Sequence, residues 1–291
     1  MTHLRKMMLE ELQRRNYAET TIRSYIRIVK DFSRRFQRPP DRLGPEHIRE
    51  YQSELFTKRK FAASTVTVYL AALRFFYTKT LKRVWSTTET PYPKRVSALP
   101  AVLSQEEVAQ LIDAALTPFH RTLLMTLYAT GVRRAELTRL KVTDIDSRRM
   151  VIHVQGGKGR KDRDVMLSPK LLDEFRKHWR RLGRKPSVWL FPGNRHHSSD
   201  QPISTKVVWH ACRNATKRAG IKKQVHPHTI RHCFATHLLE RGTDLRSIQM
   251  LLGHNDLEQT TIYLHISERH LNATASPLDS LLLKSELPQE E

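Results

Sequence analysis

A set of basic, imidazole and phenol side chains in this sequence suits an attack on a phosphodiester. Arginine binds two phosphate oxygens with its planar fork and keeps its charge. Histidine and lysine transfer protons, and a tyrosine hydroxyl can be the nucleophile. Donors fixed in advance stabilise the negative charge that grows in the pentacoordinate transition state. This chemistry requires neither a metal nor a cofactor. The candidates are Arg133, Lys158, His228, Arg231, His254 and Tyr263.

The spacing of two candidates places them on one helix face. His228 and Arg231 are three positions apart in a helical segment, so they can approach the same phosphate. Pro227 suits the first position of that helix, where free backbone amides also favour an anion. The sequence therefore predicts a phosphate-binding face at the start of this helix.

The position of Tyr263 requires a break in the chain before it. In one unbroken helix, at about 100° per residue, Tyr263 would face about half a turn away from His254. Gly253 predicts a helix end, and a new helix beginning near residue 256 can re-aim the tyrosine. The reference pKa of a tyrosine is about 10, so nearby positive charge or a base must activate it. Lys158, in a glycine-rich turn, is the candidate acid for the leaving 5′-oxygen.

Composition indicates a polyanionic partner. The 291-residue chain has a formal net charge of +22, and basic residues are in excess in both halves. Such basicity is typical of nucleic-acid-binding proteins, although a solvated basic surface is the alternative. Only two cysteines, Cys212 and Cys233, are present, which favours a reduced compartment. The sequence shows no signal peptide and no membrane-spanning run, so we expect a soluble intracellular protein.

The first part of the chain shows helical periodicity. Apolar residues recur at helical spacing from Ile22 to Phe32 and again from Val66 to Tyr77. We expect about four helices here, one of which begins at Gly44-Pro45. Residues 86–100 carry several prolines among Ser and Thr, which predicts an extended linker between two domains.

The second part of the chain predicts many helices and a small sheet. Ser104 to Glu107 matches a capping box, and Ser168-Pro169 suits another helix start. Residues 150–155 and 164–167 flank a glycine-rich turn, which predicts a β-hairpin. The predicted fold is mainly α with a small antiparallel β-sheet, an α+β class. Further helices are expected at 119–129, 169–182, 204–219, 228–241, 244–252 and 256–264.

These motifs together resemble the tyrosine recombinases, the phage integrase family. Residues Thr130–Leu137 resemble the family's first arginine box, and Gly157–Asp162 resemble its β-hairpin lysine. Residues His228–His232 resemble the second box. Leu251–His254 and Thr260–Tyr263 resemble the final histidine and the nucleophile segment. The full catalytic set is present in the family's order, and the compact length resembles its Xer-type and short mobile-element members.

The resemblance implies a reaction and a role for each residue. Tyr263 would attack a DNA phosphate, form a 3′-phosphotyrosine and release a 5′-hydroxyl. Lys158 would protonate the leaving oxygen, and Glu136 would brace the site. Arg133, Arg231, His228 and His254 would bind and stabilise the phosphate, with His228 also assisting proton transfer.

The resemblance also implies an assembly and a domain organisation. Strand exchange would pass through a Holliday junction in a homotetramer on double-stranded DNA, formed from a monomer or weakly associating protein in the prokaryotic cytoplasm. A second recombinase or an accessory protein is a further expected partner. The domains would be a SAM-like four-helix core-binding domain (1–86), a linker (87–100), a catalytic domain (101–270) and a tail (271–291). Leucines in the tail predict a helix that docks on a neighbouring subunit, with docking on its own domain as the alternative.

Two features depart from the family pattern or leave a choice open. Ile230 stands where the family usually has leucine. Arg134 follows Arg133, so the choice of Arg133 as the phosphate-binding residue depends on the motif register. The strong basicity favours a mobile-element integrase over a chromosome-dimer resolvase.

Four other readings use parts of the same sequence. His228/His232 and Cys233/His237 have the i,i+4 spacing of zinc ligands, but the pairs point in different directions. Packing or hydrogen bonding is the simpler role for His232 and His237, and Cys212 and Cys233 are most simply inert apolar thiols. Acidic residues near the hairpin could hold two metal ions. A DNA-binding protein without chemistry would be expected to lack a catalytic residue, and a type IB topoisomerase would share the chemistry without partner exchange. The acidic residues are Asp144, Asp146, Asp162 and Asp164.

Overall fold

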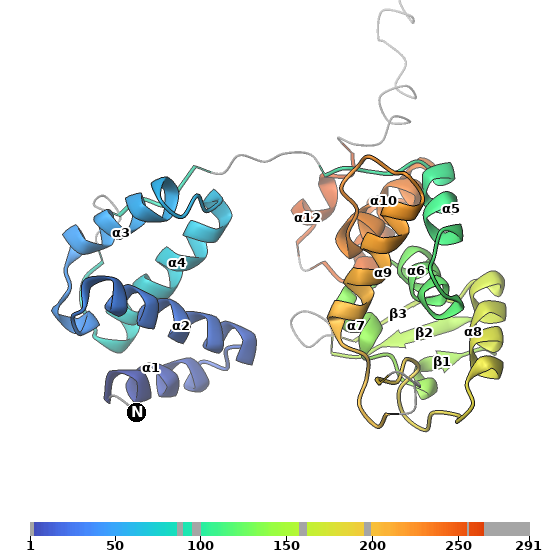
Figure 1. Cartoon of the computed structure of the whole chain (residues 1–291), viewed down its shortest axis with the longest axis horizontal. Coiled ribbons are helices and arrows are strands. Elements are labelled where there is room, and N and C mark those ends of the chain that lie inside the picture. Colours follow the sequence, from blue (N-terminus) through green and yellow to red (C-terminus); the bar gives the residue numbers. More distant parts are fainter. Residues whose placement is uncertain are drawn as a thin grey trace, which may run out of the picture. The chain divides into compact units, whose positions relative to one another are not determined.

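The computed structural model describes residues 3–85, 90–94, 100–156, 162–194, 199–254 and 256–264. Contacts divide the chain into two compact units, Met1–Ala98 and Leu99–Glu291. Figure 1 shows helices in both units and strands in the second. The predicted class, mainly α with a small antiparallel sheet, is therefore confirmed.

Within its described residues, the first unit packs four α-helices around an aromatic core. Phe32, Tyr51 and Phe76 are almost fully buried in it. Gly44 precedes a helix that has Pro45 as its first residue, as the sequence predicts. The elements are α1 (His3–Arg14), α2 (Glu19–Phe36), a 3₁₀ turn (Pro40–Arg42), α3 (Pro45–Thr57), α4 (Ala63–Phe75) and a π-helical turn (Phe76–Thr80).

Part of the predicted linker packs against this first unit. The Thr90 side chain is buried, and Gln52 Nε2 donates to the carbonyl of Pro91 at 2.9 Å. The contacts at residues 90 and 91 shorten the extended segment that the prolines predict.

The second unit contains eight α-helices within its described residues. Ser104 and Ser168 cap α5 and α8 by accepting from the amides of Glu107 and Leu171, at 3.2 Å in both cases. The elements are α5 (Gln105–Asp113), α6 (Pro118–Thr130), α7 (Arg134–Thr138), a 3₁₀ turn (Val142–Asp144), β1 (Ile145–Asp146), β2 (Val151–Val154), β3 (Arg163–Met166), α8 (Pro169–Arg181), α9 (Thr205–Arg218), α10 (Pro227–Glu240), α11 (Leu245–Leu252) and α12 (Glu258–Thr261).

The described strands form one antiparallel sheet in the order β1-β2-β3. Val151 pairs with Met166, and Val154 pairs with Arg163. The hairpin prediction is confirmed, but β1 was not predicted because two residues carry too little periodicity. Strand β3 begins at Arg163, one residue before the predicted start, and this shift matters for the site.

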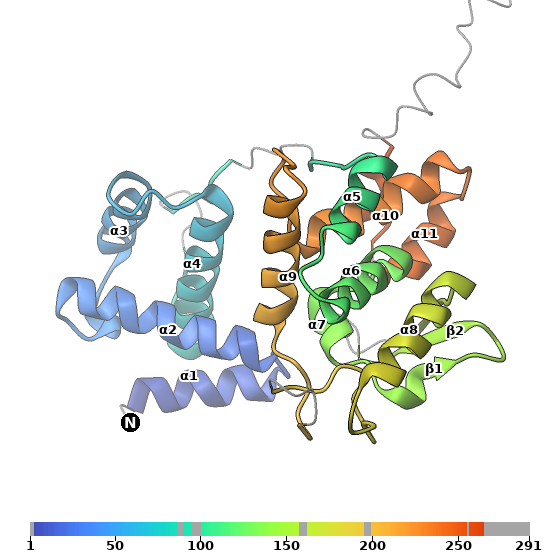
Figure 2. The ribbon, with the colours of Figure 1, turned by 45° about the vertical axis from the view of Figure 1, so that its right-hand side comes forward.

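Helix α6 lies at the centre of the second unit, packed against α8, α9 and α10 (Figures 1 and 2). Leu123, Leu124 and Leu127 of α6 are fully buried. This packing fixes the end of α6, which leads directly into the first arginine box.

The prediction of a helix over residues 256–264 is wrong in its extent. Helix α12 covers only Glu258–Thr261. The amides of Tyr263 and Leu264 donate to the carbonyls of Thr260 and Thr261, three residues back, which is the tighter 3₁₀ pattern. So short a helix depends on its packing for stability.

None of the described helices combines the length and the apolar character needed to cross a bilayer.

Candidate active site

A glycine turn between α6 and α7 positions Arg133. Gly131 has φ of +60°, and a Cβ atom there would lie 2.3 Å from Phe234 Cδ1. Only glycine fits this backbone without strain or collision. The turn makes Arg133 the N-cap residue of α7, with an extended backbone. Arg134, the first residue of α7, is exposed.

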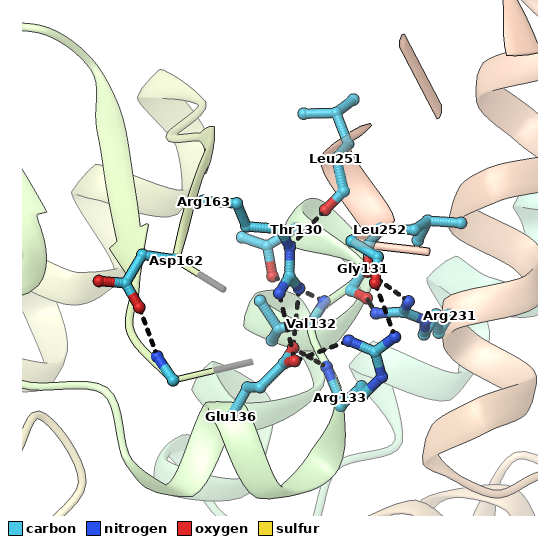
Figure 3. A network of polar contacts seen from close by, with 12 residues as sticks. Thr130, Gly131, Val132, Arg133, Glu136, Asp162, Arg163, Arg231, Leu251 and Leu252 are labelled. Atoms are coloured by element: carbon cyan, nitrogen blue, oxygen red, sulfur yellow. Dashed lines mark hydrogen bonds and ion pairs between the residues drawn. The ribbon is translucent and has the colours of Figure 1, made fainter. Parts of the chain in front are cut away.

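Arg133 is held from two sides. Its Nη1 donates to Glu136 Oε1 at 2.8 Å, and its Nη2 donates to the carbonyl of Gly253 at 3.1 Å. The amide of Arg133 also donates to Glu136 Oε2 at 2.8 Å. The carboxylate therefore fixes both the backbone and the side chain of this arginine (Figure 3).

Arg231 lies beside Arg133 and is 3% exposed. Its Nη1 donates to the carbonyl of Gly131 at 2.7 Å, and its Nη2 donates to the carbonyl of Leu252 at 2.6 Å. Burial, followed by the charge of Arg133, lowers the pKa of Arg231 to about 9. The guanidinium thus remains charged at neutral pH. The structure brings these two candidate arginines together from α10 and the start of α7 (Figure 3).

Glu136 also binds a third arginine, Arg163, which sequence reasoning did not select. Arg163 Nη2 donates to Glu136 Oε2 at 2.7 Å, and its Nε donates to the carbonyl of Leu251 at 2.7 Å. Burial raises the pKa of Glu136, but the contacts with Arg163 and Arg133 outweigh it and lower this pKa to about 2. The sequence does contain one indication of this role. Arg163 lies two residues before the buried Val165 and so shares its strand face, where a charged side chain needs a partner.

His254 follows the helix break that the sequence predicts. Gly253 ends α11 with φ of +61°. His254 Nδ1 contacts Thr260 Oγ1 at 2.9 Å, and Thr260 is fully buried. Burial, followed by the charges of Arg231 and Arg133, lowers the pKa of His254 to about 4. The imidazole is therefore neutral at physiological pH.

The Tyr263 hydroxyl lies 3.1 Å from His232 Nδ1, and Tyr263 is 1% exposed. Its ring packs in an apolar cluster with Phe234, Ile248 and Leu252. Burial raises the pKa of Tyr263, although Arg231 and Arg133 act in the opposite direction. The two arginines thus lower the pKa of Tyr263, as the sequence predicts, but burial outweighs them in this arrangement. The sequence assigned His232 to packing or hydrogen bonding and did not connect it with Tyr263.

The remaining candidates differ in what the structure shows of them. His228 lies exposed in the first turn of α10. Desolvation and then the charge of Arg231 lower its pKa. Lys158 lies outside the described residues, as do residues 265–291 with the predicted docking helix.

The residues of the alternative metal readings have other partners. His237 Nδ1 contacts the Tyr128 hydroxyl at 2.8 Å, and its Nε2 contacts the Leu103 carbonyl at 3.0 Å. Cys233 Sγ accepts from the Leu103 amide at 3.2 Å. Within the described residues, no three His, Cys, Asp or Glu side chains gather as metal ligands would.

The hairpin carboxylates bind groups of the hairpin and its flanking segments. Asp144 accepts from Lys141 N and Gln155 Nε2 at 2.8 Å and 2.7 Å. Asp162 accepts from the amide of Gly156 at 2.7 Å, and Asp164 contacts His153 at 2.8 Å. Asp162 also lies 3.6 Å from His153, so these acids hold the local structure of the hairpin.

Comparisons with known proteins agree with this architecture. The profile described as "Phage integrase family" matches residues 101–270, and that of "Phage integrase, N-terminal SAM-like domain" matches residues 4–87. A Sinorhizobium fredii protein of the integrase/recombinase type is 46% identical over 282 residues, covering 97% of this chain and 90% of that protein. The tyrosine recombinase XerA of Pyrococcus furiosus is 41% identical over 181 residues, 62% of each chain.

A solved structure shares the fold. A lambda integrase tetramer bound to a Holliday junction has a TM-score of 0.69 at 18% identity, over 87% of this chain and 74% of that chain. At this identity the likeness shows the fold alone. The family profile, by contrast, spans more than half of the chain, and the 46% identical relative spans almost all of it. The chain therefore belongs to the phage integrase family of tyrosine recombinases, enzymes that break and rejoin DNA.

Proposed function

We propose that this chain carries out site-specific DNA recombination with Tyr263 as its nucleophile. The Tyr263 oxygen attacks the phosphorus, the bond to the 5′-oxygen breaks, and a 3′-phosphotyrosine forms. The phosphotyrosine keeps the energy of the phosphodiester, so the strand can rejoin without ATP. The observation that carries the proposal is the pairing of Arg133 and Arg231 on the carbonyls of Gly253 and Leu252.

Arg133 and Arg231 are proposed to hold the non-bridging oxygens of the scissile phosphate. Each uses only its two Nη atoms in the contacts found among the described residues. The other guanidinium hydrogens remain for phosphate oxygens. Because the guanidiniums are anchored before DNA binds, they need little reorganisation as charge develops.

The imidazoles and the lysine are proposed to handle hydrogen bonds and protons. His254, fixed by Thr260, donates to a phosphate oxygen, and His228 assists proton transfer at the edge of the site by taking up the proton that the Tyr263 hydroxyl loses. The neutral His232 accepts the hydrogen bond of the Tyr263 hydroxyl in the free protein. Lys158 gives the proton that the 5′-oxygen takes up, a role that rests on the motif around it.

The partner is proposed to be double-stranded DNA, bound by a tetramer in the prokaryotic cytoplasm. The net charge of +22 supports a polyanionic partner. The shared fold with an integrase tetramer on a Holliday junction supports the assembly. A core-binding domain over 1–86 and a catalytic domain over 101–270 remain our proposed boundaries, with residues 271–291 as the subunit-docking tail.

Covalent trapping tests the proposed chemistry. The wild type and Tyr263→Phe are incubated in EDTA with nicked duplexes drawn from DNA that flanks the gene. We expect an SDS-resistant, protease-sensitive protein–DNA adduct with the wild type alone, because a nick lets the cleaved 5′-fragment leave.

Two results would count against the proposal. Tight binding without an adduct on any fragment would favour a DNA-binding protein without chemistry. An adduct with Tyr263→Phe would mean that another residue is the nucleophile.

A further inference from the structure

Arg163 uses all three guanidinium nitrogens within the protein. Its Nη1 and Nη2 donate to the two oxygens of Glu136, at 3.2 Å and 2.7 Å. Its Nε donates to the Leu251 carbonyl at 2.7 Å. The side chain is only 10% exposed. All three nitrogens of this arginine therefore bind protein groups, whereas an arginine that binds phosphate needs free donors.

The three arginines of the site, Arg133, Arg163 and Arg231, bind three consecutive carbonyls at the end of α11. Arg163 binds Leu251, Arg231 binds Leu252, and Arg133 binds Gly253. The last carbonyls of a helix lack intrahelical partners and carry the negative end of the helix dipole, so cations stabilise them. The end of α11 therefore serves as one common anchor for three side chains that come from α7, β3 and α10.

Glu136 connects two of these arginines, Arg133 and Arg163, a second time. It lies between Arg163 and Arg133 and binds both (Figure 3). A buried carboxylate with two guanidinium partners is fixed in orientation, and it fixes Arg133 in turn. Losing one partner would allow the carboxylate to turn and Arg133 to move with it.

Resting on the function proposed above, we propose that Arg163 is a positioning residue for cleavage. It sets Arg133 through Glu136 and sets the Gly253–His254 segment through the Leu251 carbonyl. In this role it acts through those protein groups and not by contact with the phosphate or the nucleophile. Its position also ties β3 to the arginine site.

The backbone at Gly253 is consistent with this role. A Cβ atom at Gly253 would lie 3.0 Å from Arg163 Cδ and 3.2 Å from its Nη1. The guanidinium therefore packs directly against the glycine that precedes His254. A displacement of Arg163 would therefore shift the backbone at Gly253 and with it the imidazole of His254.

The test compares Arg163→Met and Arg163→Lys with a matched control, Arg149→Met. Arg149 is 72% exposed near the base of the same hairpin, so its loss changes the net charge equally without touching the site. Single-turnover adduct formation and DNA affinity are measured for each full-length variant. For Arg163→Met we expect cleavage about 100-fold slower, the scale of a misplacement of about 1 Å, with DNA affinity within about threefold of the wild type.

Arg163→Lys separates charge from geometry. Lysine keeps the positive charge, but one nitrogen cannot span Glu136 and the Leu251 carbonyl together. We expect it to recover at most about tenfold of the lost rate. Full recovery would show that charge alone matters and would overturn the positioning role.

A double-mutant cycle guards against simple misfolding. Arg163→Met together with Glu136→Gln leaves no unpaired buried carboxylate. Because both residues act on Arg133 through the same ion pairs, we expect the double variant to lose clearly less rate than the product of the two single losses. Losses that multiply, or an Arg163→Met variant as active as Arg149→Met, would overturn the proposal.

A spectroscopic readout separates this inference from the proposed function. In the free protein labelled with ¹⁵N-arginine, the anchored Nη groups of Arg133 should give restrained signals. In Arg163→Met, faster rotation of the Arg133 guanidinium should average these signals. In Arg149→Met they should stay as in the wild type. If the wild type forms no adduct, the proposed reaction is wrong, and these signals still decide whether Arg163 holds Arg133. Unchanged Arg133 signals in Arg163→Met would contradict the inference.

Discussion

At the scale of single residues, burial and positive charge both keep the site imidazoles neutral. The pKa values of His232 and His254 are lowered to about 4, with burial as the largest cause. Neutral His232 can accept from the Tyr263 hydroxyl, whereas a protonated imidazole cannot. The same surroundings therefore favour the hydrogen bond of Tyr263, and they make protonation of the two imidazoles at low pH unfavourable.

These two histidines should make stability depend on pH between about 4 and 6.5. In this window the unfolded chain binds more protons than the folded one, since the unshifted histidine pKa is 6.5. The stabilisation is complete above pH 6.5 and is lost as the pH falls toward 4. Each shift corresponds to at most about 3 kcal/mol, and partial exposure makes it smaller.

Chemical denaturation at several pH values checks this expectation. His232→Gln and His254→Gln should each lose less stability than the wild type between pH 7 and 4.5, because glutamine does not titrate. Acidic groups contribute equally to all three proteins. If both variants keep the wild-type pH dependence, the histidines are not the source.

Sequence could reveal some site residues because they lie in motifs with a fixed order. Arg163 could not be recognised in this way, because its partners Glu136 and Leu251 are 27 and 88 positions away in the sequence. Its significance required the strand register and the position of α11, both set by tertiary packing. The contact between His232 and Tyr263 was hidden for the same reason.

At the scale of elements, the break after α11 determines where His254 and Tyr263 lie. Gly253 combines φ of +61° with a close approach to Arg163. An alanine in this backbone region costs about 1–2 kcal/mol and would also push the guanidinium away. We expect Gly253→Ala to lose about that stability and to cleave at least about tenfold more slowly.

Gly220 supplies a matched control for the backbone strain. It has φ of +68°, and nothing lies within 4 Å of a Cβ atom placed there. Gly220→Ala should lose comparable stability, measured by urea unfolding, while adduct formation stays at the wild-type rate. Equal activity of the two alanine variants would mean that the contact with Arg163 has no effect on cleavage.

Short-range sequence features predicted those elements whose geometry they determine without help from tertiary packing. The capping serines, the proline at a helix start and the glycine-rich hairpin turn all specify backbone geometry over a few residues. Helix α12 was predicted too long, because its length depends on how Thr260 and Tyr263 pack rather than on periodicity. Strand β1 forms only because β2 pairs with it.

At the scale of the whole molecule, charge should dominate the affinity for DNA. Each phosphate contact releases counterions, so affinity falls steeply as salt rises. With a net charge of +22, we expect affinity for duplex DNA to fall at least about 10³-fold between 50 and 200 mM salt.

Fluorescence anisotropy with the full chain and a salt series measures this dependence. A duplex of unrelated sequence is the control, because contacts to the DNA backbone do not depend on base sequence. A loss of less than about tenfold would correspond to few phosphate contacts and would contradict broad electrostatic binding.

The burial of Tyr263 gives one side chain two roles that it cannot fill at the same time, packing in the core and the proposed attack on a phosphate. Its ring fills space among Phe234, Ile248 and Leu252, so reaching a phosphate would leave a void where the ring now packs. Emptying an aromatic site of this size costs about 3–5 kcal/mol unless neighbours collapse into it. The free protein therefore keeps its proposed nucleophile within its own core, and contacts made with DNA must offset the cost of the void before any strand can be cut.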